Sequence, residues 1–236
     1  MALPPLHEGL AFPPFQRRLV AAVSAVGERY GLALAGVHAL RAHGLTDRMG
    51  DDLVFATAGE TPLPDVAEDV AGALREAGLE AAIAEVTARA GRLTAEDAVT
   101  RETCAIHLLR EALQRPPVAC AGLPVLAAED AAGLVTRAFH EQGLVADFAD
   151  VAALAARFSH RDLERLAQLH DDDFSASELL ARLEFLDTVP DETYGVDEER
   201  IGEIRRFARG WVEDIKARRV EDGDADYDDP DIPEVD

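Results

Sequence analysis

The chain has 236 residues, of which 48% are apolar, enough to build a sizeable buried core. Its formal net charge is −23, and residues 221–236 hold nine acidic residues and no basic one, which leaves −14 on residues 1–220. Because nucleic-acid affinity depends largely on Lys and Arg side chains that neutralise phosphates, and no segment gathers a basic patch, the composition argues against a nucleic-acid partner.

The sequence also lacks the features of membrane and secreted proteins. It has no long uninterrupted apolar run, and the first residues show no basic start followed by an apolar stretch. We therefore expect a cytoplasmic protein without membrane contact. Cys104 and Cys120 give neither a disulfide framework nor the spacing of metal ligands, so we expect buried free thiols.

Apolar spacing, together with glycine and proline breaks, predicts an α/β arrangement for the first half of the chain. The predicted helices cover residues 15–30, 37–43 and 65–77. The predicted strands cover residues 32–35, 51–57, 81–89 and 103–109, the last two joined near 91–97. Pro116, Pro117 and Pro124 predict a break before the second half.

From residue 128 onward every periodic segment is helical. The predicted helices cover residues 128–142, 147–157, 160–169, 175–187 and 197–219. This order of elements predicts the α+β class: a small mixed β-sheet domain with helices over residues 1–127, followed by a helical domain over residues 128–220. Residues 221–236 contain too few apolar side chains to offset the entropy of ordering, so we predict a disordered acidic tail.

Two segments carry a resemblance to a known family. Residues 32–57 read LALAGVHALRAHGLTDRMGDDLVFAT, and residues 129–151 read EDAAGLVTRAFHEQGLVADFADV. The first resembles the L-A-G-G-x-A-L-x-x-H-G-L-x-x-R-x-T-x-D-L-D-L-F-T opening of the AbiEii/AbiGii toxin family, and the second its E-D-L-x-A-x-K…R-D-F-x-D-V stretch. The resemblance implies a minimal nucleotidyltransferase fold of the polymerase-β type.

The family's fold implies a metal-assisted chemistry at the second strand. Two carboxylates one residue apart on that strand point the same way and hold a divalent metal against the nucleotide phosphates. A third carboxylate comes from a neighbouring strand. A Gly-Gly or Gly-Ser pair opens the preceding helix, so that backbone N–H groups can approach the triphosphate.

This sequence departs from that pattern at the metal positions. Asp52 stands where the first carboxylate belongs, but Val54 occupies the second position and His107 aligns with the third. Asp51 is not a simple substitute, because adjacent strand residues face opposite sides. Asp52 and His107 alone are too few ligands for a defined zinc site.

The phosphate-facing positions depart as well. The Gly-Gly pair is Gly36–Val37, and Gly50 replaces the threonine two residues before Asp52. In the second stretch Val135 replaces the lysine and Ala146 the arginine. Asp147 and Asp150 of that stretch are retained and would border a vestigial nucleotide pocket.

These departures predict a non-catalytic homologue that needs no cofactor and binds a partner protein or small ligand. The first alternative is an active nucleotidyltransferase or phosphotransferase, as in a toxin–antitoxin system. It would use a nucleoside triphosphate and Mg²⁺ and gather carboxylates from Asp51, Asp52 and Glu102. The second is an acidic protein that mimics nucleic acid.

Overall fold

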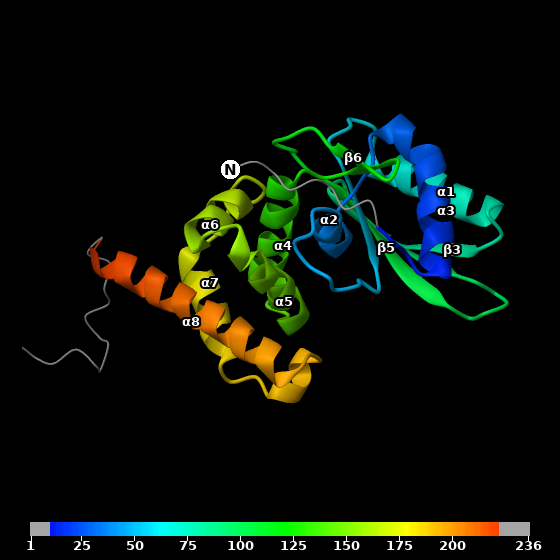
Figure 1. Ribbon diagram of the computed structural model, residues 1–236. Coiled ribbons are helices and arrows are strands. Elements are labelled where there is room, and N and C mark those ends of the chain that lie inside the picture. The colour runs from blue at the N-terminus through cyan, green and yellow to red at the C-terminus, as the bar shows by residue number, and fades with distance from the viewer. Residues whose placement is uncertain (1–9, 222–236) are drawn as a thin grey trace, which may run out of the picture.

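A mixed sheet forms the first part of the molecule and helices form the second (Figure 1). The structure is a computed structural model that describes residues 10–221. Within these residues the sheet ends at Val125, and every element from Ala128 onward is helical. The predicted α+β class is therefore confirmed.

The sheet has seven strands in the order β3-β4-β5-β2-β1-β7-β6. The strands are β1 Ala33–Leu34, β2 Leu53–Thr57, β3 Glu80–Val86, β4 Ala90–Glu96, β5 Thr103–Arg110, β6 Val118–Cys120 and β7 Leu123–Val125. Strand β2 runs parallel to β5, and β1 to β7, whereas the other neighbours are antiparallel. Because β2 and β5 are parallel, the residues that precede both strands meet at one end of the sheet.

One predicted connection is a strand. Residues 90–96 were expected to lie within the link between two strands, but they form β4, which pairs with both β3 and β5. The buried positions of β4 are Gly91, Leu93 and Ala95. Two of these side chains are too small to produce the apolar alternation that identifies a strand in sequence.

The β6–β7 hairpin was also not predicted. Its turn uses Ala121 and Gly122, both with positive φ (49° and 81°). Its strands are three residues each, Pro116 and Pro117 precede β6 and Pro124 lies within β7, so the sequence indicates only a break.

The predicted helices are all present, most with ends within two residues of the expected ones. They are α1 Pro14–Tyr30, α2 Gly36–Ala42, α3 Leu63–Glu76, α4 Ala128–Gln142, α5 Val145–Ala153, α6 His160–Gln168, α7 Ala176–Leu186 and α8 Glu198–Glu221. Helix α5 ends earlier than predicted and continues as the 3₁₀ turn η1, Leu154–Ala156. The predicted acidic tail lies outside the described residues except for Glu221, which belongs to α8.

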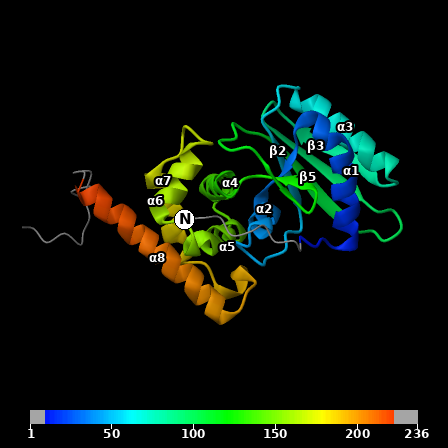
Figure 2. The same cartoon turned by 45° about the horizontal axis from the view of Figure 1, so that its top comes forward.

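Helices cover the sheet from both sides. Helices α1 and α3 lie on one face, while α2 and α4 lie on the other, as both views show (Figures 1 and 2). Helix α4 packs against α2 on one side and α6 on the other, so it connects the sheet to the remaining helices. At the α4–α6 contact a Cβ on Gly133 would lie 2.5 Å from the backbone oxygen of Leu166, so only glycine permits this approach.

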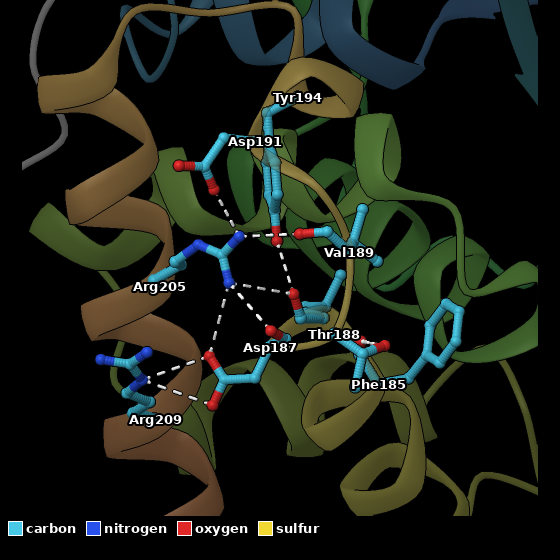
Figure 3. A network of polar contacts seen from close by, with 9 residues as sticks. Phe185, Asp187, Thr188, Val189, Asp191, Tyr194, Arg205 and Arg209 are labelled. Atoms are coloured by element: carbon cyan, nitrogen blue, oxygen red, sulfur yellow. Dashed lines mark hydrogen bonds and ion pairs between the residues drawn. The ribbon is translucent and has the colours of Figure 1, made fainter.

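Two arginines of α8, Arg205 and Arg209, bind the connection between α7 and α8 (Figure 3). The Arg205 guanidinium on α8 donates to the backbone oxygen of Val189 at 2.8 Å and to Asp191 Oδ1 at 2.5 Å. Tyr194, in the 3₁₀ turn η2 (Asp191–Tyr194), donates its hydroxyl to the backbone oxygen of Leu186 at 3.0 Å. This network satisfies backbone carbonyl groups at the end of α7 and in the loop that follows it.

Two further expectations concern the cysteines and the membrane. Neither Cys104 nor Cys120 forms a disulfide and both are buried, as predicted. Among the described residues, no helix combines the length and apolar character needed to span a bilayer.

Candidate functional site

The structure brings together the three positions where the resembled family carries its metal ligands. Val54 on β2 is the register partner of His107 on β5, and Asp52 immediately precedes β2. His107 Nε2 lies 3.6 Å from Asp52 Oδ2, and Asp52 Oδ1 accepts a hydrogen bond of 3.2 Å from the backbone N–H of Ala105. His107 thus lies beside Asp52 and Val54, as its alignment with the third ligand position of the family pattern requires.

Two valines lie beside the start of α2, where the family pattern would place the phosphate approach. Gly36 opens α2 with φ +60°, and a Cβ there would lie 3.0 Å from Val54 Cγ2. A Cβ at Gly50 would collide with Val37 Cγ1. The side chain of Val37 therefore fills the space that a threonine at position 50 would need, so these two departures from the family pattern are one packing change.

The thiol near Asp52 is not a nucleophile. Burial, followed by the negative charges of Asp52 and Asp51, raises the pKa of Cys104 to about 11. Its Sγ also donates to the backbone oxygen of Asp51 at 3.2 Å. Because thiolate is the reactive form, Cys104 stays inert near neutral pH.

Helix α5 contributes Asp147 and Asp150 to the same region. Asp150 accepts two hydrogen bonds from one edge of the Arg48 guanidinium: Arg48 Nε donates to Oδ1 at 2.6 Å, and Nη2 donates to Oδ2. The hydrogen bonds that Arg48 donates to Asp150 raise the pKa of Arg48, while burial raises the pKa of Asp150 despite that arginine. Asp147 Oδ2 is buried without a hydrogen-bond partner, and burial, then the charge of Asp150, raises its pKa.

All seven residues predicted for the site line one cavity of about 430 Å³ between the sheet and α4–α5. They are Gly36, Val37, Asp51, Asp52, His107, Asp147 and Asp150. Val135 also lines it, where the family has lysine, whereas Ala146 is exposed and does not. The sequence pattern thus located this cavity, although the role of each residue stays a prediction.

The arginines of the cavity are already paired with carboxylates. Arg48 is paired with Asp150, and Arg137 lies 2.8 Å from Glu111 Oε1 and 3.3 Å from Glu141 Oε1. Our sequence analysis missed Arg48, although it matches the arginine in the family's opening motif. Glu102 does not line the cavity, and residues 10–221 contain no group of three or more His, Cys, Asp or Glu that could hold a metal ion.

Comparison with known proteins gives matches by structure only. No family model matches the sequence, and no curated protein does. MenT4, a nucleotidyltransferase toxin from Mycobacterium tuberculosis, matches with a TM-score of 0.57 at 17% identity, covering 89% of this chain and 89% of its own.

Two crystal structures from Helicobacter pylori match similarly. One is of a protein proposed to be a nucleotidyltransferase (TM-score 0.55, 16% identity, 86% of this chain and 96% of that chain). The other is JHP933 (TM-score 0.53, 17% identity, 88% of this chain and 95% of that chain). The chain therefore has the fold of nucleotidyltransferase toxin structures over most of its length.

Proposed function

We propose that this chain is a binding protein built on the nucleotidyltransferase fold and that it carries out no nucleotidyl transfer. The observation that supports this most is the contact of Val37 with Gly50 and of Val54 with Gly36. Apolar side chains fill both the second metal-ligand position and the approach to the start of α2. A nucleotidyl-transfer site depends on positioning and charge neutralisation, so these replacements remove what the reaction needs.

Charge supports the same proposal. A nucleoside triphosphate brings about four negative charges, which need nearby cations. Arg48 and Arg137 are the arginines of the cavity, and each is matched by a buried or partly buried carboxylate. Recruiting Arg48 to a phosphate would leave the buried Asp150 carboxylate without its arginine, at a cost of about 2–3 kcal/mol, and recruiting Arg137 would take the arginine partner from Glu111.

The alternative is an active enzyme, and the Asp52–His107 pair is the observation in its favour. The two side chains lie 3.6 Å apart, are partly exposed and border the cavity. A carboxylate beside an imidazole can act as a general base. Such an enzyme would use Asp52 and would need its metal held by fewer protein ligands than the family pattern provides.

Label transfer separates the two functions. The protein is incubated with each radiolabelled nucleoside triphosphate and Mg²⁺ or Mn²⁺, with RNA and total protein as acceptors. We expect no transfer above background, and titration calorimetry with the same nucleotides should detect no binding. Transfer that disappears in Asp52→Ala would establish the enzyme and reject the proposal.

A further inference from the structure

Four charged side chains meet inside the molecule, where the end of α6 packs against α4 and the end of β5. Glu111 directly follows β5, Asp130 and Arg137 lie on α4, and His170 comes just after α6. The side chains of Glu111, Asp130 and His170 are 3% exposed or less, and that of Arg137 is 11% exposed. This buried group therefore joins the helical part of the molecule to the sheet.

Each ring nitrogen of His170 lies near a different carboxylate. Nε2 lies 3.3 Å from Asp130 Oδ1, and Nδ1, which forms no hydrogen bond, lies 3.7 Å from Glu111 Oε2. A neutral imidazole carries a proton on only one nitrogen, so one of the two carboxylates would then face a lone pair. Only the imidazolium cation presents an N–H group to both carboxylates.

The Asp130 carboxylate is held in its charged form by the loop that follows β5. Its Oδ1 accepts a hydrogen bond from the backbone N–H of Gln114, and its Oδ2 one from that of Arg115, both at 2.9 Å. Burial opposes the charged form, but the neighbouring His170 and these two N–H groups outweigh it and lower the pKa of Asp130. His170 therefore faces a fixed negative charge.

The charges of the buried group balance only when His170 is protonated. Arg137 Nη1 donates to Glu111 Oε2 at 2.9 Å and to the backbone oxygen of His170 at 3.1 Å. Glu141 also lies 3.3 Å from Arg137 Nε, but half of its side chain is exposed, so solvent screens this pair. Two cations thus match two buried carboxylates, whereas loss of the His170 proton leaves one buried negative charge in excess.

The backbone of α4 leaves room for the ring at this place. A Cβ on Gly133 would lie 2.9 Å from His170 Cδ2, in addition to its collision with the backbone oxygen of Leu166. Glycine therefore lets both the end of α6 and the imidazole ring approach α4 closely. The ring is held within the helix contact itself, so its charge acts on that contact.

We infer that a proton on His170 stabilises the contact of α6 with α4 and with the end of β5, and that loss of this proton at alkaline pH weakens the junction. The charged groups that contact His170 come from both elements packed against it: Glu111 from the end of β5, and Asp130 and Arg137 from α4. The inference does not depend on the proposed function, because it concerns the junction and not the candidate cavity.

The direction of the pH dependence follows from the surroundings of the ring. Burial alone disfavours the imidazolium, but Asp130 and Glu111 outweigh it, so the pKa of His170 is raised above its ordinary value of 6.5. The unfolded chain therefore releases this proton at a lower pH than the folded chain does. The stabilisation is fully present below about pH 6.5 and is lost as the pH rises through the raised pKa.

The first measurement is an NMR titration of the histidine ring nitrogens in the full ¹⁵N-labelled chain from pH 6 to 10. The His170 ring is assigned from its contacts with the Hα protons of Gly133. We expect both of its nitrogens to be protonated at pH 7, and the amides of Gln114 and Arg115 to shift with the same midpoint as the ring. A His170 ring that is neutral at pH 7 would overturn the inference, and this measurement needs no variant.

The second measurement is urea unfolding at pH 7 and pH 9. Between these values the unfolding equilibrium constant of the wild-type protein should rise at least about threefold more than that of His170→Gln, which lacks the titrating ring. The control is His160→Gln at the other end of α6, where burial lowers the histidine pKa, so this ring holds no proton over the range. The control should keep the wild-type pH dependence within about twofold. Equal pH dependence of the wild-type protein and His170→Gln would overturn the inference.

Discussion

Val37 and Gly50 illustrate how a packing change can look like two lost functional residues. Compared with the family pattern, valine replaces a glycine at one position and glycine replaces a threonine at the other. In the structure a Cβ at Gly50 would meet Val37 Cγ1, so the larger residue at one site requires the smaller at the other. This coupling could not be predicted from sequence, because α2 and the loop before β2 come together only in the fold.

The coupling predicts a non-additive double-mutant cycle. Gly50→Thr should destabilise the protein by about 1–3 kcal/mol, because it overpacks a filled space. In a Val37→Gly background the same change should cost at least about 1 kcal/mol less. Urea unfolding of the four proteins measures both values, and effects that add within about 0.5 kcal/mol would contradict the coupling.

His38 is a second residue whose burial has a measurable consequence. Its ring is buried on α2, with its centroid 5.1 Å from that of Phe12. Burial, and then the charge of Arg41, lowers the pKa of His38 to about 4. The unfolded chain, with an ordinary histidine pKa near 6.5, therefore takes up the proton first as the pH falls.

Stability should therefore be lost as the pH falls from about 6.5 towards 4. Between pH 7 and pH 5 this one group should cost roughly 2 kcal/mol. His38→Leu removes the titration. Between pH 7 and pH 5 the free energy of unfolding of this variant should therefore fall by roughly 2 kcal/mol less than that of the wild-type protein. Parallel pH dependence in the two proteins would show that His38 does not titrate in this way.

At the level of elements, the helices were predicted far better than the strands. Helical periodicity is carried by many residues, as in α4, whose bounds match the prediction. Strand β4 was missed because glycine and alanine fill two of its buried positions, and the β6–β7 hairpin because its strands are very short. The candidate site was found from a motif that spans helix, loop and strand, but its ion pairs were not, because they join residues distant in sequence.

The Arg48–Asp150 pair joins α5 to the loop before β2. Removing the arginine alone should cost more stability than removing both side chains. Arg48→Met leaves the buried Asp150 carboxylate without its cation, so we expect a loss of about 2–3 kcal/mol, less than for a fully buried pair because Arg48 is partly exposed. Adding Asp150→Leu should recover most of that loss. Thermal unfolding of the single and double variants measures this, and a double variant less stable than Arg48→Met would refute it.

At the scale of the whole molecule, the buried core and the most acidic stretch of the chain lie in different parts of the sequence. The described part packs its core along α8 only as far as Ile215, the last buried residue of that helix. Eight acidic residues follow Glu221 outside the described residues. The buried positions of α8 therefore end before the acidic segment begins. We expect that segment to affect the free energy of unfolding through its charge.

Deleting residues 222–236 should change stability little, and in a direction set by salt. Removing eight negative charges from a chain of net charge −23 relieves self-repulsion, which favours the compact state at low ionic strength. The gain at about 0.02 M salt should be no more than roughly 0.5 kcal/mol, and it should vanish at 0.5 M, where the Debye length falls to a few ångströms. Urea unfolding of both chains at the two salt concentrations measures the difference. Destabilisation of more than about 1 kcal/mol at high salt, where repulsion is screened, would mean that the segment packs on the folded body and would reject the predicted disorder.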